Sequence, residues 1–376
     1  MRTPVCDLLG IDFPIVAFSH CRDVVAAVTN AGGLGVLGGG THSPEHLEME
    51  LRWIDEHVKG RPYGVDLLLP SKYEGADEGG LDREAIAERL PAEHVAFVDD
   101  LIRRYNIPEL PSDADKFGRL DMSPVSPLGY EPLLDVAFAH PIRLIASALG
   151  TPPPSLVARA HDAEHCVVAA LAGTVEHAKR HVEHGAQVIV AQGTEAGGHT
   201  GEIATMVLVP DVVDAVSPVP VLAAGGIATG RQLAAAIALG AQGAWCGSVW
   251  LATDEAETDP VVRQKFLTAT SRDTVRSRSI TGKPARMLRS AWTEEWDSVK
   301  APSTLPVPLQ SALIAEAQMR ITHAGTQPGA AQLANYFVGQ VVGRLNRIRS
   351  CHQVMMDMVT EYAEVVERFV EQSAVD

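Results

Sequence analysis

Short apolar segments alternate with helical segments along most of the chain, and this alternation constrains the fold more strongly than any other feature of the sequence. The apolar segments have the length of buried strands, and glycine follows several of them. Strands are predicted at residues 13–17, 34–37, 63–69, 142–149, 167–171, 187–192, 219–224 and 243–247. Buried strands that are separated by helices form a parallel sheet with helices on its outside.

Helices are predicted in the intervals between these strands, at residues 23–30, 44–57, 154–161, 175–183, 206–216 and 229–239. Ser43 followed by Pro44 is a typical helix start, because serine caps the first turn and proline fits the first helical position. Eight strand–helix units predict an α/β protein with a closed (β/α)8 TIM barrel. An open doubly wound sheet is the alternative. It is disfavoured because the chain has no G-x-G-x-x-G motif with an acid about twenty residues later.

Two long segments, residues 70–130 and 254–327, interrupt this rhythm. Within and after them, helices are predicted at residues 93–104, 260–268 and 309–319, and long helices over 328–372. Insertions at the carboxyl ends of barrel strands lie over the mouth of the barrel. We therefore expect a barrel domain of residues 1–253 and 328–376, which includes insertion 70–130, and a smaller lid domain of residues 254–327.

The composition is acidic, with a formal net charge of −16, which disfavours a general nucleic-acid or anionic-membrane binder. One dense basic stretch contains Arg276, Arg278, Lys283, Arg286 and Arg289. These side chains could hold a phosphorylated or CoA-bearing substrate, or they could form a solvated surface of the lid.

The five cysteines are scattered, without a C-x-x-C pair or a metal-type spacing, so reduced thiols in a cytoplasmic protein are expected. The N-terminus lacks the pattern of a signal peptide, and no apolar run approaches ~18 residues, so no membrane span is expected. Most of the clustered histidines fall on helices outside the barrel, and no metal site is predicted from them: His161, His165, His177, His181 and His184.

A glycine-rich turn at residues 191–202 follows the sixth predicted strand and contains His199. Glycine lets a flat ligand approach the backbone closely, and histidine exchanges a proton near neutral pH. The turn therefore combines a ligand platform with an acid or base. The alternative is a tight loop with a solvent-facing histidine.

Two further glycine turns follow the seventh and eighth strands, at residues 224–227 and 246–248. Many barrels bind a phosphate at these two loops, where backbone N–H groups and a helix N-terminus favour an anion. A cofactor anchored there could lay its ring across the mouth beside Gln192 and His199, which suits flavin mononucleotide (FMN). The alternative is that these glycines only turn the chain.

These motifs resemble those of the nitronate monooxygenase family, also called 2-nitropropane dioxygenase-like. The resemblance is carried by Gln192-Gly193-x-Glu195-Ala196-Gly197-Gly198-His199-x-Gly201, Ala224-Gly225-Gly226-Ile227, Gly247-Ser248, Asn30-Ala31-Gly32-Gly33-Leu34-Gly35 and Val338-Gly339-Gln340. It implies a TIM barrel with a smaller lid, non-covalent FMN, and a pocket histidine at His199. The positions to which it assigns cofactor contacts are Ala17, Phe18, Asp66, Gln192, Gly197, Gly198, Ala224, Gly225, Gly226, Cys246, Gly247 and Ser248.

The family that these motifs resemble contains several activities. We expect a nitronate monooxygenase, which oxidises alkyl nitronates with O2 to a carbonyl compound and nitrite. An NAD(P)H-dependent reductase of an enoyl thioester or quinone is the alternative, since residues 195–209 also look like the enoyl-reductase branch. A flavin-binding scaffold without activity is the non-enzymatic alternative. A homodimer is compatible with the sequence.

The chain departs from the family pattern at two places. The first strand usually ends in Pro-Met-Ala-Gly, whereas this chain reads Pro14-Ile15-Val16-Ala17-Phe18-Ser19-His20. Asp66 stands where an asparagine is usual. His20 could be a second acid or base, or it could have a hydrogen-bonded structural role. Cys246 is expected to be a small core residue, and Trp292 and Trp296 are expected in the core of the lid.

Overall fold

The computed structural model describes residues 1–111, 125–163 and 165–373 of the 376-residue chain. Eight parallel strands form a closed barrel in the order β1-β2-β3-β4-β5-β6-β8-β9. Pairing of β1 with β9, with Ile15 opposite Ala244, closes the ring. The strands are β1 (Ile15–Ser19), β2 (Leu34–Gly38), β3 (Gly64–Leu68), β4 (Leu144–Ala148), β5 (Val167–Ala172), β6 (Val188–Gln192), β8 (Val221–Ala224) and β9 (Gly243–Cys246). The predicted TIM barrel is confirmed, and the open sheet is excluded.

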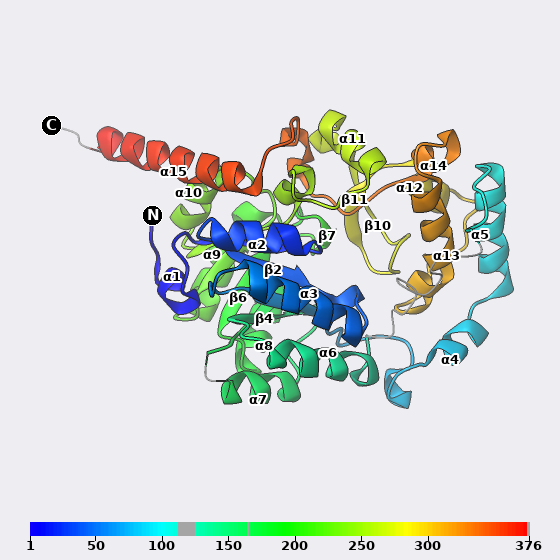
Figure 1. The fold of residues 1–376 in the computed structure, drawn as a ribbon, viewed down its shortest axis with the longest axis horizontal. Helices are drawn as coiled ribbons and strands as arrows, with labels where there is room; N and C mark the ends of the chain where they lie inside the picture. Colours follow the sequence, from blue (N-terminus) through cyan, green and yellow to red (C-terminus); the bar gives the residue numbers. More distant parts are fainter. Residues whose placement is uncertain (112–124, 164, 374–376) are drawn as a thin grey trace.

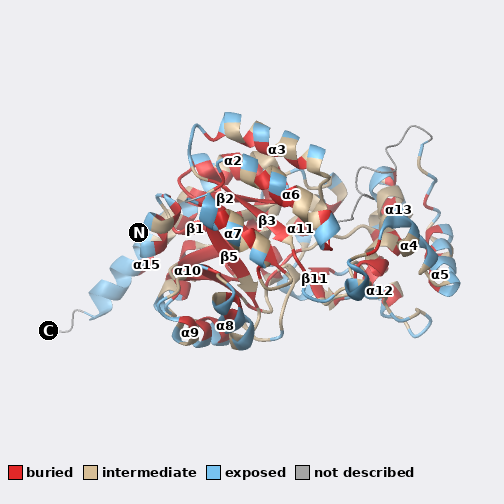
Figure 2. Cartoon of the chain, turned by 90° about the horizontal axis from the view of Figure 1, so that it is seen from below, coloured by how far each residue is buried: buried red, intermediate tan, exposed pale blue. Residues whose placement is uncertain are grey.

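Helices surround the barrel, and their inward faces are buried against it (Figures 1 and 2). They are α2 (Arg22–Asn30), α3 (Pro44–His57), α6 (Pro127–Ala139), α7 (Pro154–Asp162), α8 (Val175–Glu183), α9 (Thr205–Val216) and α10 (Gly230–Ala238). Local sequence sets several helix starts: Ser43, Thr174 and Thr229 each accept a hydrogen bond from a backbone N–H of the first turn. A short helix that was not predicted, α1 (Pro4–Leu9), precedes the first strand.

The barrel interior is filled by alternate side chains of each strand, among them Val16 and Val190. Two residues further along the same strands, Phe18 and Gln192 therefore reach the carboxyl end of the barrel, which we call the mouth. The rings of Phe18 and Trp245 stack there with centroids 6.4 Å apart. This layer forms the floor of any site at the mouth.

A second lobe lies beside the barrel and has its own apolar core (Figure 1). Its helices are α4 (Arg83–Glu88), α5 (Ala92–Arg104), α12 (Ala291–Trp296), α13 (Leu309–Ala324) and α14 (Pro328–Leu333). Trp292 and Trp296 lie in its core with Leu101 of α5 and Ile314 of α13, so the lobe draws on both insertions. The domain boundaries stay a prediction, and residues 112–124 of the first insertion lie outside the described residues.

A small antiparallel sheet connects the lobe to the barrel. Its strands, in the order β10-β11-β7, are β10 (Thr274–Ser277), β11 (Ala285–Leu288) and β7 (Gly198–His199). No strand was predicted in the basic stretch, which forms the β10–β11 hairpin. Arg276 and Arg286 occupy paired positions in it. These charged residues interrupt the apolar pattern by which the short strands could have been predicted.

The C-terminal region is less helical than predicted. Besides α14 it contains the short 3-10 helix η5 (Gln340–Arg344) and one long helix, α15 (Cys351–Ser373). The backbone is extended at Gly339, where glycine allows a close approach to the Glu195 carbonyl oxygen, because a Cβ there would lie only 2.6 Å from that oxygen. The other elements are α11 (Pro260–Thr268), as predicted, and the 3-10 helices η1 (Gly39–Thr41), η2 (Ala76–Glu78), η3 (Ser248–Ala252) and η4 (Ser271–Asp273).

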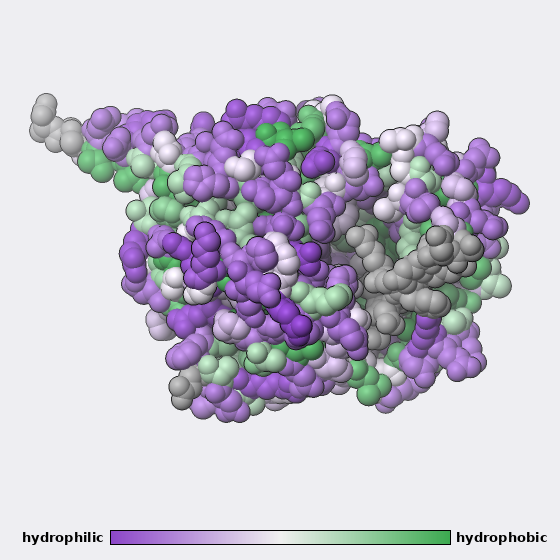
Figure 3. Space-filling view, in the orientation of Figure 1, coloured by the Kyte–Doolittle hydropathy of each residue, from purple (hydrophilic) through white to green (hydrophobic). Residues whose placement is uncertain are grey.

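The last turns of α15 project from the body, and apolar side chains gather on them (Figures 1 and 3). Val366, Phe369 and Val370 are the exposed large apolar residues of this helix. The homodimer that the sequence allows stays a prediction. No helix within the described residues is both long enough and apolar enough to span a bilayer.

Candidate functional site

The glycine-rich turn after β6 is held in place by the start of α9. The Glu195 carboxylate accepts hydrogen bonds from the Thr205 backbone N–H at 2.9 Å and from the Thr205 hydroxyl at 2.8 Å. Gly193 and Gly197 must be glycine, because a Cβ would lie 2.1 Å from the Thr205 hydroxyl in the first case and 2.8 Å from the Gly339 nitrogen in the second. Gly198 differs, since a Cβ there would meet nothing within 4 Å, although its φ of +76° favours glycine. The backbone at Gly198 is therefore open to a ligand.

His199 follows this open glycine and pairs with the lid hairpin rather than facing solvent in a loop. Its Nε2 lies 2.8 Å from the Thr281 hydroxyl, and its ring lies 6.2 Å from that of Phe337. Burial, together with the smaller effect of the nearby charge of Lys283, lowers the pKa of His199 to about 4. His199 is therefore neutral at pH 7 and can accept a proton.

The cations of the basic stretch differ in the groups that they contact. Arg286 is structural, because its Nε donates to the Thr194 carbonyl at 2.8 Å and ties the hairpin to the glycine-rich turn. Arg276 donates to the Thr200 carbonyl at 3.1 Å, next to His199. Lys283 is half-buried, and burial lowers the pKa of its ammonium group. Within the described residues, no carboxylate lies within ion-pair distance of this ammonium group.

The glycine turns after β8 and β9 lie side by side, since Ala224 pairs with Trp245. Gly225 is needed for the backbone itself, because it has a φ of +95° and a Cβ would lie 3.0 Å from the Gly193 carbonyl oxygen. Gly247 has no such constraint: a Cβ there would lie 3.8 Å from the Phe18 ring. The space beside Gly247, at the start of η3, fits the phosphate cradle expected at these loops.

Asp66 lies in the middle of β3, between two residues that pack outward, so its side chain faces the barrel interior. It is only 4% exposed. Burial therefore raises the pKa of Asp66 well above its usual range. A protonated carboxyl donates a hydrogen bond, as an amide would, so Asp66 can replace the asparagine that the family pattern has there.

Replacing Asp66 with asparagine should stabilise the protein increasingly as the pH rises above ~4, the ordinary pKa of an aspartate. The folded state retains the Asp66 proton where the unfolded state has lost it, so the wild type loses stability as the pH rises towards the raised pKa. Urea unfolding at pH 4.5 and pH 8 measures the difference. Asp214→Asn, at an exposed position on α9, is the control. A stability difference that is the same at both pH values would contradict the protonated state.

The other residues that were predicted to contact the cofactor differ in the direction of their side chains. Ala17 and Cys246 pack in the apolar layer between the barrel and its helices, so only their backbone atoms face the mouth. Burial raises the pKa of the Cys246 thiol to about 12, which suits the expected core residue rather than a nucleophile. The Nδ1–H of His20 donates a hydrogen bond to the Gly38 carbonyl at 3.1 Å, so His20 acts on the backbone of β2. Gln192 lies at the end of β6, beside Ala224.

The sequence indicated neither Thr281 nor Phe337 as a site residue. Both reach His199 only through the pairing of β7 with β11, and no local sequence pattern indicates that pairing.

A set of ligand atoms close enough for a metal ion is formed by Cys21, Asp23 and Glu257. Burial raises the pKa of the Cys21 thiol, which weakens it as a metal ligand.

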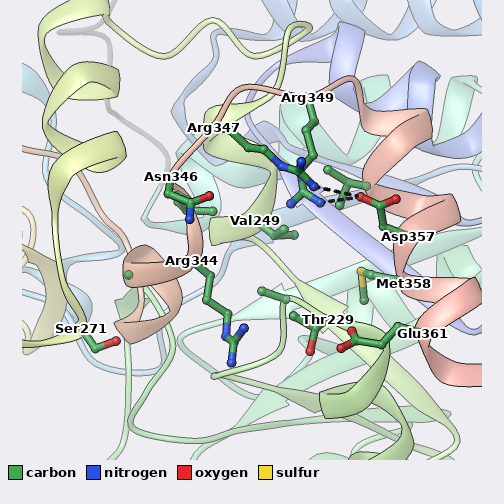
Figure 4. A pocket seen from close by; sticks show the side chains of 14 residues that line it. Thr229, Val249, Ser271, Arg344, Asn346, Arg347, Arg349, Asp357, Met358 and Glu361 are labelled. Carbon is green, nitrogen blue, oxygen red and sulfur yellow. Dashed lines mark hydrogen bonds and ion pairs between the residues drawn. The ribbon is translucent and has the colours of Figure 1, made fainter. Parts of the chain in front are cut away.

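A cavity of about 670 Å³ lies between η5 and α15 (Figure 4). Ala228, Thr229 and Val249, which follow the glycine turns after β8 and β9, also line it. Arg347 and Arg349 on its wall both reach the carboxylate of Asp357, at 3.8 and 2.7 Å. Arg344 also lines this cavity and makes no ion pair within the described residues. None of the predicted site residues lines it.

Comparison with known proteins adds a family and relatives to this geometry. Residues 2–361 match the family described as "Nitronate monooxygenase". A protein of Mycobacterium tuberculosis named "Putative monooxygenase Rv1533" is 65% identical over 97% of this chain and 98% of its own length. A second protein of that organism, a hydroxy-methyl-oxo-octahydro-indene-carboxyl-CoA dehydrogenase, is 30% identical over 79% of this chain and 69% of its own length. The solved structure of nitroalkane oxidase from Streptomyces ansochromogenes has a TM-score of 0.79 and 28% identity, and covers 97% of this chain and 99% of that one.

Proposed function

Because the chain belongs to the nitronate monooxygenase family, we propose that it binds FMN and oxidises alkyl nitronates with oxygen to a carbonyl compound and nitrite. Family membership makes the chain an oxidoreductase, and the solved nitroalkane oxidase has the same fold. One observation supports an anionic substrate. The neutral base His199 lies near the ammonium group of Lys283, which has no carboxylate partner among the residues that the structure describes, in an otherwise acidic protein.

The backbone at Gly225, Gly226, Gly247 and Ser248 would hold the phosphate of FMN, as the open space beside Gly247 supports. At the mouth, the Gln192 amide and the protonated Asp66 carboxyl, with the backbone of Gly197, Gly198 and Ala224 and the ring of Phe18, would surround the flavin. FMN, when bound, supplies an acceptor for the electrons of the nitronate and a route by which they reach oxygen.

Thr281 sets the proton arrangement of His199. The Thr281 hydroxyl accepts from the Lys283 backbone N–H at 3.3 Å and donates its single proton to the Lys283 carbonyl at 3.3 Å. The Nε2 of neutral His199 then donates to Thr281, which leaves Nδ1 without a proton. Nδ1 can therefore accept a hydrogen bond from a bound water that orients the nitronate, which is already deprotonated at its reacting carbon. The Lys283 ammonium group attracts the negative charge of the nitronate.

A reductase of an enoyl thioester is the second candidate. Its support is the dehydrogenase relative whose name specifies a carboxyl-CoA compound, together with the likeness of residues 195–209 to the enoyl-reductase branch. The two candidates require different electron donors, since the reductase needs NAD(P)H and the monooxygenase does not.

Propane 2-nitronate should bleach the yellow holoprotein when the two are mixed anaerobically, whereas NADH and NADPH should not. The nitronate supplies the electrons that reduce the flavin, and it carries the negative charge that the Lys283 ammonium group attracts. Stopped-flow absorbance of the flavin measures all three reactions, and nitrite release after admitting air confirms turnover. Bleaching by NADH or NADPH alone would move the protein to the reductase candidate, and no bleaching by any donor would favour the scaffold.

A further inference from the structure

We propose that residues 336–340 join the phosphate cradle to the turn that carries His199, and that Gly339 is the positioning residue of this link; the inference rests on the proposed binding of FMN. We call this segment the strap. It contains the Val338-Gly339-Gln340 motif and leads into η5. Its contacts reach the lid hairpin, the glycine-rich turn and the start of η3, which are three parts of the candidate site.

Two consecutive N–H groups of the strap donate to two different loops of the mouth. The Gly339 N–H donates to the Ser248 hydroxyl oxygen at 2.8 Å. The Gln340 N–H donates to the Glu195 carbonyl at 2.9 Å. Ser248 follows β9 and Glu195 follows β6, and these two strands are separated in the barrel by β8. The strap therefore connects the phosphate cradle directly to the glycine-rich turn.

The strap has little freedom to shift against the glycine-rich turn. A Cβ at Gly339 would lie 2.6 Å from the Glu195 carbonyl oxygen and 2.9 Å from the Gly197 nitrogen. Both atoms belong to the backbone and cannot swing aside as a side chain could. The φ of −81° at Gly339 suits any residue, so this close contact, rather than the dihedral angle, requires glycine. Val338 is fully buried in the apolar layer around the barrel and anchors the strap.

The other end of the strap lies beside His199. The Tyr336 carbonyl accepts a hydrogen bond from the Leu288 N–H of β11 at 3.0 Å, and Phe337 forms a further bridge to the same strand. The Phe337 ring lies 6.2 Å from the imidazole of His199. Phe337 is two positions from Gly339, which corresponds to about 7 Å of extended chain. A displacement of the strap at the phosphate cradle therefore reaches the surroundings of the base.

The strap also determines how the Ser248 hydroxyl can act. The Ser248 oxygen accepts from the Gly339 N–H, which leaves the single hydroxyl proton for a ligand. A phosphate oxygen at the cradle is a strong acceptor for that proton, because it is charged. The two hydrogen bonds then form a chain from the Gly339 N–H through the hydroxyl to the phosphate, and each strengthens the other. The position of the strap therefore sets the affinity for the phosphate, and a bound phosphate holds the strap in return.

The affinity for FMN relative to riboflavin, which lacks the phosphate, tests this link. Fluorescence titration of the full-length chain freed of cofactor gives both dissociation constants. Ser248→Ala should lower the preference for FMN about tenfold or more, since it removes a hydrogen bond to a charged group, and Ser248→Thr should retain the preference. Gly339→Ala should lower it similarly although Ser248 is intact, because the added Cβ displaces the N–H of the strap. Gly343→Ala is the matched control: it adds the same methyl group in η5, against Ser271, and should leave the preference unchanged.

If Gly339→Ala loses affinity for FMN and riboflavin equally, or for neither, the proposal is overturned, because a glycine with a merely structural role would affect both flavins alike. Hydrogen exchange of the wild type needs no variant. The Gly339 amide should exchange severalfold more slowly in saturating FMN than in saturating riboflavin, and equal rates would also overturn the proposal. A wild type that binds no FMN would refute the proposed function as well, whereas intact FMN binding with either of the other two results refutes the strap alone.

Discussion

Replacing His199 with alanine should lower the rate of flavin reduction by a nitronate about 10²–10⁴-fold, the usual loss for a positioned acid or base. The neutral imidazole is the only base that the described residues place at the end of the glycine-rich turn, and its pKa of about 4 keeps it unprotonated at pH 7. FMN content and the midpoint of thermal unfolding should remain at wild-type values, because the ring makes a single side-chain hydrogen bond, to Thr281. Stopped-flow reduction of both proteins by propane 2-nitronate measures the effect.

His161→Ala is the matched control, since His161 is 89% exposed on α7, outside the barrel. It should leave the reduction rate unchanged. Thr281→Val keeps the shape of the side chain and removes the hydroxyl that orients His199, so we expect a smaller loss of rate, which Thr281→Ser should restore. An unaltered rate in His199→Ala would exclude His199 from the chemistry.

Gly247→Val should weaken FMN binding about 100-fold or more while the protein without cofactor stays folded. The loss corresponds to one or two hydrogen bonds to a charged phosphate. Gly247 has a φ of −112°, which any residue can adopt, and a Cβ there makes ordinary contact with Phe18. The added methyl groups would instead occupy the space in which we place the phosphate. Fluorescence titration of the cofactor-free protein with FMN measures the dissociation constant.

Gly225→Val is a poorer test of the same cradle. Its φ of +95° and the close Gly193 carbonyl would strain the backbone whether or not FMN is present. Ala92→Val, on an exposed position of α5 in the lobe, controls for the added volume and should bind FMN like the wild type. Wild-type affinity in a folded Gly247→Val variant would place the phosphate elsewhere.

The barrel and the glycine-rich motifs could be predicted because they depend on neighbouring residues. Each strand is a short apolar run, and the alternation of interior and outward side chains follows from the strand period alone. The starts of α3 and α11 were predictable for the same reason, since a capping residue and a proline stand next to each other in the sequence. The position of His199 at the carboxyl end of β6 also follows from local order.

The partners of those residues depend on contacts between distant parts of the chain. Thr281 lies 82 positions from His199 and reaches it only because β7 joins the lid hairpin. The lobe core combines α5 with α13, from insertions that the barrel separates in the sequence. Likewise, the sequence around Asp66 does not indicate that its pKa is raised, because that pKa depends on burial by the strands on either side.

By itself, then, the sequence determined the closed barrel, the three glycine turns at its mouth and the histidine among them, since hydrophobic period and backbone freedom are properties of short segments. Tertiary structure alone decided the raised pKa of Asp66, the lowered pKa of His199 and the Thr281 partner of the imidazole. Desolvation and long-range pairing create these features, and both arise only when segments far apart in the chain pack together.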